Sequence, residues 1–370
     1  MAHRINYKPT GIMLSSALGD VGISVDGTYV DVTLTAPGGI VILSERYYAY
    51  GGQVTLFDLA SLIESEMRSS GSTFADFTLR VFTDTISNKA DSHTFHILYC
   101  DRFTVCTDVE LFLRENFLST LRYRRVNENS TTSLFFFTFA GDSLAYSISY
   151  IARKIENGVR LRNSFTLGSG TATGWSVRQI NIAISTIAAD AAAKAGVRPN
   201  EIEVVSFTVT CGQRSITCAV DRSLPGDSDS FAFRNCFNVW DVAVLPLITT
   251  AKTDVERSTA VINGSSQFCN QSVNKTYEVS AGPITSDEAE WIDQLFTSYE
   301  VFRFEPNDCD ETEPYILQHI LITDMTCELS DSDEKPNTVK FTWRYTDNRA
   351  IVRFTASRGI FTSPFNYVYS

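Results

Sequence analysis

The chain has 370 residues, of which 44% are hydrophobic and 20% charged, a composition able to bury the cores of two or three domains. Its net charge is −12 and no Lys/Arg-rich run is long enough to grip a duplex, which argues against a nucleic-acid-binding protein. The eight cysteines stand singly without a C-x-x-C pair, which favours reduced thiols in strands over a disulfide or zinc framework.

The first predicted module covers residues 21–106 and follows an N-terminal arm at 1–20. The stretch "YVDVTLTAPGGIVILSERYYAY" predicts two strands joined by a Pro-Gly-Gly turn. A helix is predicted near 58–69, with Asp58 as its N-cap and an apolar stripe of Leu59, Leu62, Ile63 and Met67. Alternating apolar residues in "FTLRVF" predict a half-buried strand next, so the module runs hairpin, helix, hairpin.

The same order recurs in a second predicted module at 130–235, after a connector at 107–129. Asn157 and Gly158 form the turn of its first hairpin. A helix is predicted near 176–195, with Ser176 as its N-cap and Gly196 at its C-terminal end.

One basic run with an interleaved tyrosine, "LRYRRV", lies in the first connector. Its arginines, Arg122, Arg124 and Arg125, could contact nucleic acid or an acidic patch on a neighbouring subunit. Because the protein is acidic, we favour the contact between subunits.

A second connector at 236–250 leads to the third predicted module at 251–370, whose helix near 285–298 has the clearest start. Thr285 and Glu288 match a capping box, in which each side chain binds the other's backbone N–H. An apolar stripe follows, which we expect to pack on a sheet: Trp291, Ile292, Leu295 and Phe296.

These elements predict a mainly β, α+β protein of three tandem β-sandwich- or barrel-like modules, each with one docked amphipathic helix. No Pro-rich or Gly/Ser-rich linker separates the modules, so we expect them to pack together. No apolar run approaches the ~18 residues of a membrane-spanning helix, so no membrane span is expected.

No motif in the sequence indicates catalysis, and we expect no enzyme activity, no metal and no cofactor. His93 and His96 are three apart, which places them on opposite faces of a strand. Two acidic segments, "EPNDCDETEP" and "SDSDEKPN", have alternate carboxylates but lack the glycine and terminal glutamate of an EF-hand loop. They are interpreted as solvated hairpin loops.

The last third of the chain resembles structural tail proteins of tailed bacteriophages and prophages of gut Bacteroidales-type bacteria. The resemblance rests on "STAVINGSSQFCNQSVNKTYEVSAGPITSDEAEWIDQLFTSYEVFRFEP" followed by "ILITDMTCELSDSDEKPNTVKFTWRYTDNR". Their order of hairpin, capped helix, strand and long hairpin is similar to the tail-tube and tail-tip folds of long-tailed phages.

The resemblance implies a virion component of the tail tip, distal tail or baseplate hub, assembled in the host cytoplasm. It implies a ring of three- or six-fold symmetry that joins other tail or baseplate proteins around a DNA path without binding DNA specifically. Candidate acidic residues lining that path are Asp308, Asp310, Asp331 and Asp333. A carbohydrate- or receptor-binding adhesion module is the alternative, and a phage-borne glycan hydrolase is less favoured.

Overall fold

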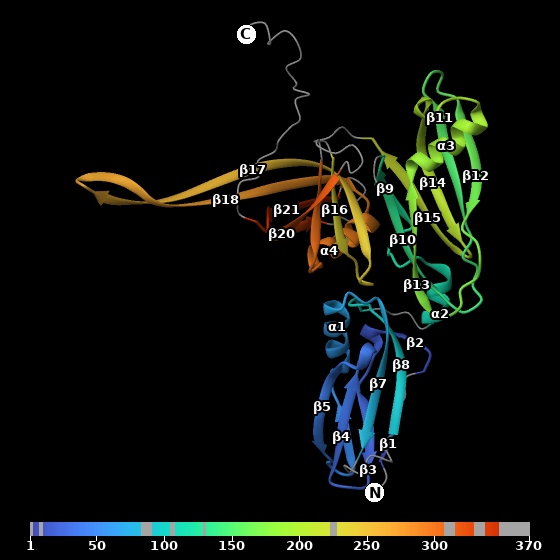
Figure 1. Cartoon of the computed structure of the whole chain (residues 1–370), viewed down its shortest axis with the longest axis vertical. Coiled ribbons are helices and arrows are strands. Elements are labelled where there is room, and N and C mark those ends of the chain that lie inside the picture. Colours follow the sequence, from blue (N-terminus) through green and yellow to red (C-terminus); the bar gives the residue numbers. More distant parts are fainter. Residues whose placement is uncertain are drawn as a thin grey trace.

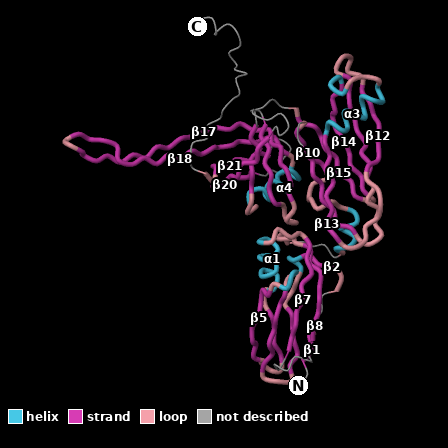
Figure 2. The backbone as a smooth tube through the Cα atoms, in the orientation of Figure 1, coloured by secondary structure: helices cyan, strands magenta, loops and turns pink. Residues whose placement is uncertain are grey.

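The computed structural model describes residues 3–6, 10–82, 91–103, 108–128, 131–222, 228–306, 315–328 and 337–347. Strands dominate and the helices are short (Figure 2). Two sandwiches and a closed barrel meet at one junction, and a long hairpin projects from the barrel (Figure 1). The predicted mainly β, α+β fold class with several sheets is confirmed.

The first sandwich pairs a three-stranded sheet, β1-β3-β6, with a five-stranded sheet, β2-β8-β7-β4-β5. Helix α1 and two short 3-10 helices complete it. The elements are β1 (His3–Ile5), β2 (Ile12–Leu14), η1 (Ser15–Ala17), β3 (Val21–Val25), β4 (Tyr29–Thr35), η2 (Pro37–Gly39), β5 (Val41–Tyr48), β6 (Gln53–Leu56), α1 (Leu59–Ser69), β7 (Phe74–Phe82) and β8 (Asp91–Leu98).

The predicted N-terminal arm at 1–20 is wrong, because its described residues belong to both sheets. Strand β1 pairs antiparallel with β3, and β2 pairs parallel with β8. The helix predicted near 58–69 is confirmed, and Ile63 and Met67 are buried, whereas Leu62 is exposed. Asp58 precedes this helix in a left-handed conformation, but its side chain accepts no backbone N–H and instead accepts a bond from Ser61.

The second sandwich repeats the strand order of the first. Its five-stranded sheet, β12-β11-β14-β15-β9, again ends in a parallel pair, and β10 and β13 form the facing sheet. Helix α2 (Val109–Glu115) precedes it. The elements are β9 (Tyr123–Asn127), β10 (Thr131–Thr138), β11 (Tyr146–Lys154), β12 (Arg160–Leu167), β13 (Ser176–Ala183), α3 (Ile184–Ala195), η4 (Pro199–Glu201), β14 (Ile202–Cys211) and β15 (Arg214–Asp221).

The helix predicted near 176–195 begins eight residues later than expected, and Ser176 is not its N-cap. Residues 176–183 form β13, which pairs with β10 along its whole length. Ile180 and Ile184 satisfy a helical spacing of four, but the buried Ile182 between them belongs to strand alternation. The predicted end is confirmed, since Gly196 takes the left-handed C-cap conformation.

The third module is a closed barrel with the order β16-β17-β18-β21-β20-β19. It differs in topology from the two sandwiches. Modules that share the predicted order of hairpin, helix and hairpin therefore adopt two different folds. The elements are β16 (Ser228–Arg234), β17 (Trp240–Ile262), β18 (Ser265–Ile284), α4 (Ser286–Thr297), β19 (Val301–Pro306), β20 (Tyr315–Glu328) and β21 (Asn337–Tyr345).

Strand pairing also corrects the predicted module boundaries. The connector at 107–129 contains β9, a strand of the second sandwich. The connector at 236–250 contains the start of β17, which pairs with β16. The barrel therefore begins at β16 rather than at residue 251, and the second module ends before residue 228.

Helix α4 carries the apolar stripe that its sequence predicts. Trp291, Ile292 and Leu295 are buried in the barrel core, while Phe296 is partly buried and packs against Phe341 with ring centroids 5.4 Å apart. The stripe prediction is thus confirmed.

A fourth apolar cluster lies where the three modules meet. It combines residues of the first sandwich, α2, the second sandwich and the turn between β16 and β17. Its buried members are Leu14, Leu98, Cys100, Leu113, Leu118, Phe137, Phe139, Cys236, Phe237 and Val239. A shared core of this kind confirms that the modules pack together.

Candidate assembly hairpin and module junction

The β17–β18 hairpin is the most exposed part of the structure. The two strands pair from Leu247 and Ala281 out to the turn at Asn263 and Gly264, with one bulge at Cys269 that shifts the register. Both turn residues have positive φ, 51° and 79°, as the Asn-Gly dipeptide predicts for a tight hairpin turn. Residues 248–262 alone span ~50 Å at a rise of ~3.3 Å per residue, which agrees with the long projection in Figure 1.

The projecting part of this hairpin lacks any further strand neighbour among the described residues. Strand β16 pairs with β17 only over 240–246, and β21 pairs with β18 only from Tyr277 inward. Beyond those points the outer edges of both strands present unpaired N–H and C=O groups. An isolated two-stranded hairpin is marginally stable in water, and long free edges are templates for pairing with another chain.

The two faces of the hairpin differ in chemistry. Alternation places odd-numbered β17 residues on the side that continues the barrel core, which we call the inner face. Leu247 is buried there beside Ala281 in the cross-strand register. Farther out, the same face carries Val255 opposite Val273, and then Phe268, which is 67% exposed.

The two basic residues of the inner face lie over aromatic rings. The Arg257 guanidinium is 5.0 Å from the Phe268 ring centroid, and the Lys275 ammonium is 5.3 Å from that of Tyr277. Arg257 also donates a hydrogen bond to Gln271 at 3.1 Å. These contacts cover part of the apolar surface with methylene groups and leave the positive charges at the surface.

The opposite face, which we call the polar face, is dominated by hydroxyl, amide and acidic side chains. Its charged residues are Lys252, Asp254, Glu256 and Glu278, one base against three acids. Lys252 forms an ion pair with Glu278 across the strands. The hairpin therefore has a mainly apolar and basic inner face and a mainly acidic polar face, although the polar face also carries the exposed Ile248 and Ile262.

The junction at the base of the hairpin is organised around the buried carboxylate of Asp241, at the start of β17. Arg124 of β9 donates to Oδ1 at 2.6 Å, and Ser119 donates to Oδ2 at 3.3 Å. Trp291 of α4 and Asn235 donate to the same Oδ2 at 3.1 and 3.4 Å. One carboxylate thus ties the second sandwich, the connector and α4 together.

Asn238, in the tight turn between β16 and β17, joins the first sandwich to the barrel. It is fully buried in a left-handed conformation with φ of 58°. Its side-chain amide donates to the carbonyls of Met67 and Ser72, at 3.1 and 3.0 Å, at the end of α1. Tyr299 donates a hydrogen bond to the Asn238 side-chain oxygen.

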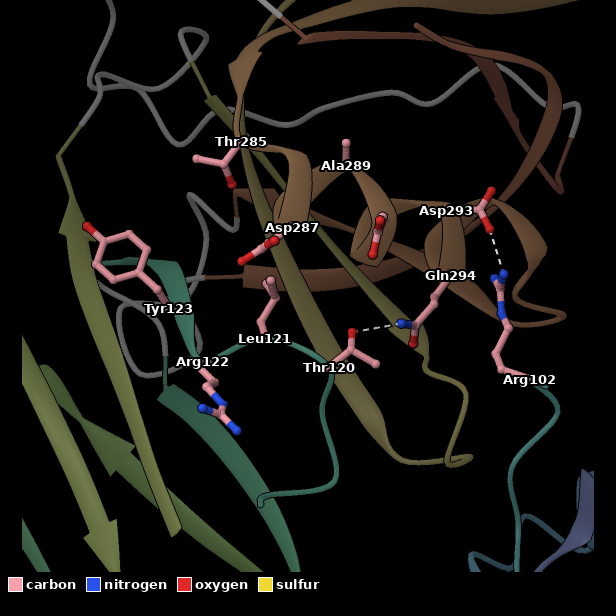
Figure 3. A pocket seen from close by; sticks show the side chains of 11 residues that line it. Arg102, Thr120, Leu121, Arg122, Tyr123, Thr285, Asp287, Ala289, Asp293 and Gln294 are labelled. Carbon is pink, nitrogen blue, oxygen red and sulfur yellow. Dashed lines mark hydrogen bonds and ion pairs between the residues drawn. The ribbon is translucent and has the colours of Figure 1, made fainter. Parts of the chain in front are cut away.

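A groove of about 830 Å³ lies between α4, the connector at 120–123 and Arg102 (Figure 3). At one end Arg102 forms a 2.7 Å ion pair with Asp293, and Gln294 donates to Thr120 at 2.9 Å. These contacts reach from the first sandwich and the connector to α4. The groove walls combine charged and hydroxyl side chains with apolar surface, and the ion pair and hydrogen bond join α4 to the segments that face it.

The arginines predicted to contact a neighbouring subunit have partners within the chain. Arg124 is buried and paired with Asp241, so that prediction is wrong for this residue. Arg125 lies 3.3 Å from Glu288, a member of the α4 capping box. Arg122 lines the groove and donates weakly to Asn116, and for it a contact between subunits stays a prediction.

The four aspartates predicted to line a channel, Asp308, Asp310, Asp331 and Asp333, lie outside the described residues. The aromatic C-terminal segment after residue 347 does too. The polar face of the hairpin was not predicted from the sequence, although its charged residues lie within the predicted module at 251–370. The alternation of polar and apolar residues in "KTDVERSTAV" was the available signal.

The described part of the chain contains no group of three or more His, Cys, Asp or Glu side chains placed to hold a metal ion. His93 and His96 lie on β8, and His96 pairs with Asp76 at 2.7 Å. Among the helices of the described ranges, none has the length and apolarity to cross a bilayer.

No family model and no curated protein matches the chain. Among solved structures, the calcium binding domain CBD12 of CALX1.1 is 13% identical, with 57% of this chain and 79% of that chain covered and a TM-score of 0.14. Trypsin-activated alpha-2-macroglobulin from Escherichia coli is 9% identical over 87% of this chain, with a TM-score of 0.20. This chain spans only 25% of the length of that protein. The plexin A4 extracellular region is 10% identical over 92% of this chain and 39% of that chain, with a TM-score of 0.22. Likenesses at this level assign neither a family nor a function.

Proposed function

We propose that this chain is a non-enzymatic structural subunit of a bacteriophage tail, at the tail tip, distal tail or baseplate hub, that forms a ring through its β17–β18 hairpin. The hairpin carries the proposal, because it combines two free edges with an uncovered apolar face. The resemblance of the last third of the chain to phage tail proteins supports the same conclusion.

In the proposed ring each hairpin pairs edge to edge with the hairpins of its two neighbours. Such a heterologous contact either closes into a ring or grows into a filament, and closure removes every free edge. The inner face, with Val255, Val273 and Phe268, then packs on a neighbouring subunit. The polar face, with Asp254 and Glu256, turns toward the axis.

An acidic axis fits the passage of DNA. Duplex DNA carries about one negative charge per ~1.7 Å of its axis, so a basic lining would bind it and slow its movement. A lining of hydroxyls, amides and carboxylates repels the duplex over a range of about 8 Å at physiological salt. In this proposal Asp254, Glu256 and Glu278 take the role that the sequence resemblance assigned to the acidic loops.

The proposal is tested on the purified full chain with two aspartate substitutions at adjacent positions on opposite faces. Val273→Asp places a charge on the inner face, and Ser272→Asp places the same charge on the polar face. We expect wild-type and Ser272→Asp protein to form closed rings in electron-microscopy class averages, and Val273→Asp protein to remain monomeric in light scattering.

A wild-type chain that stays monomeric at the highest attainable concentration would contradict self-assembly. Loss of rings in Ser272→Asp with rings retained in Val273→Asp would reverse the assignment of the two faces. Circular dichroism of both variants checks that the fold is unchanged.

One observation favours the alternative of a carbohydrate-binding adhesion module. On the outer face of the first sandwich, Tyr29 lies opposite Tyr48, which is 74% exposed, and Asp31 lies opposite Arg46 in a bidentate ion pair. The Arg46 guanidinium covers the half-buried Tyr29 ring at 4.1 Å, so Tyr48 is the exposed ring that could stack on the apolar face of a pyranose. Glycan-array binding that is lost in Tyr48→Ala would support this second candidate.

A further inference from the structure

Two cysteines from different modules meet inside the junction. Cys100 follows β8 of the first sandwich, and Cys236 lies in the turn between β16 and β17 of the barrel. Both are free thiols and both are buried in the shared core cluster. Their backbones are in contact, since the N–H of Asp101 donates to the carbonyl of Cys236 at 3.3 Å.

Side chains hold both cysteine backbones in place. The N–H of Cys100 donates to Ser15 Oγ at 2.9 Å, and the N–H of Cys236 donates to Gln294 Oε1 at 3.0 Å. The Cys100 thiol donates to the carbonyl of Arg102 at 3.6 Å. The neighbouring Cys236 thiol lowers the pKa of the Cys100 thiol, and the Cys100 thiol together with burial raises the pKa of the Cys236 thiol.

Both cysteines line a second cavity of about 370 Å³. Phe103 and Phe237 contribute apolar walls, and Arg122 contributes a positive charge, whereas the charge of Arg102 is paired with Asp293. An anionic thiol reagent such as oxidised glutathione matches the charge of Arg122. The other two buried free cysteines, Cys211 and Cys218, have pKa values raised chiefly by burial, and neither lines this cavity.

We propose that Cys100 and Cys236 are an oxidisable dithiol whose disulfide covalently couples the first sandwich to the barrel. Cys100 thiolate attacks one sulfur of oxidised glutathione, forming a mixed disulfide and releasing one glutathione thiolate. Cys236, after losing its proton to water, attacks the Cys100 sulfur and releases the second glutathione. The two cysteines lose two electrons in total, and glutathione disulfide gains them.

The test uses the full chain with Cys269→Ser, which removes the exposed hairpin thiol and its intermolecular disulfides. The protein is treated with oxidised glutathione, alkylated, digested without reductant and analysed by mass spectrometry. We expect a linked peptide pair containing Cys100 and Cys236, which disappears after reduction. The oxidised protein should have a higher Tm than the reduced protein, because the cross-link restricts the unfolded chain.

Cys236→Ser in the same background should stop the reaction at a glutathione adduct on Cys100 and abolish the gain in Tm. Cys211→Ser is the matched control and should leave both the linked peptide and the Tm gain intact. A mixed disulfide that persists on wild-type Cys100, or the absence of any linked peptide, would overturn the proposal. The linked peptide and the gain in Tm do not depend on ring formation, so their loss would leave the proposed function untouched.

Discussion

At the scale of single residues, Asp241 shows how a charge is accommodated inside this protein. The carboxylate is 2% exposed and accepts hydrogen bonds from Arg124, Ser119, Asn235 and Trp291. A buried ion pair tolerates its loss of hydration only when further hydrogen bonds complete the geometry, and here three side chains and the backbone N–H of Val242 supply them. The carboxylate therefore joins the elements that meet at the junction.

Removing one partner of this pair should therefore be far more costly than removing both. Arg124→Met leaves the Asp241 charge buried and unpaired, and should lower the free energy of unfolding by about 3–5 kcal/mol. The double variant Arg124→Met with Asp241→Leu should recover a large part of that loss. Denaturant titrations of the single and double variants measure both values, and additive losses would contradict the pairing.

At the scale of elements, helix α4 is stabilised by a capping box at its N-terminus and by the packing of its apolar stripe. The Thr285 N–H donates to Glu288 at 2.9 Å and the Glu288 N–H donates back to Thr285 at 3.2 Å, which completes the capping box. About three turns of helix are marginal alone, so the docked stripe supplies most of the stability.

Truncating single residues of the stripe should lower the unfolding free energy more at its fully buried positions than at its partly buried one. Leu295 is 0% exposed, and Leu295→Ala should cost about 2–5 kcal/mol of unfolding free energy, because it leaves a cavity in the barrel core. Phe296→Ala should cost less, since Phe296 lies at the edge of that core. Thermal unfolding of the two variants decides the order, and an equal or reversed order would show that the packing differs.

At the scale of the whole molecule, the three modules are held by contacts that each cross a module boundary. Asn238 binds the end of α1, Arg102 binds α4, and Asp241 binds β9. Figure 1 shows the two sandwiches and the barrel meeting at this one place, with the hairpin pointing away from it. The junction therefore determines the direction in which the hairpin projects.

Loosening one of these contacts should change the shape of the molecule without unfolding its modules. Asn238→Ala removes the Asn238 side-chain donations to Met67 and Ser72, and we expect a larger radius of gyration in small-angle scattering and faster proteolysis at the junction. Asn263→Ala is the matched control, because Asn263 shares the left-handed conformation but lies at the hairpin turn. Equal effects of the two substitutions would assign the change to backbone strain alone.

The sequence by itself determined the local features of this protein. The capping box at Thr285, the turn at Asn263 and the helix end at Gly196 all follow from interactions within a few residues. The alternation of polar and apolar residues along the strands was also visible in the sequence, and it predicted the mainly β class. These signals are short-range, so no tertiary contact is needed to detect them.

Only the tertiary structure decided which strands pair, where each module begins and what the junction contains. The helical spacing of Ile180 and Ile184 is equally compatible with a strand, and the pairing of β13 with β10 resolved it. Arg124 and Asp241 are 117 residues apart, and nothing local to either marks it as the partner of the other. The free edges of the hairpin are likewise defined by where β16 and β21 stop pairing, which depends on closure of the barrel and not on the hairpin's own sequence.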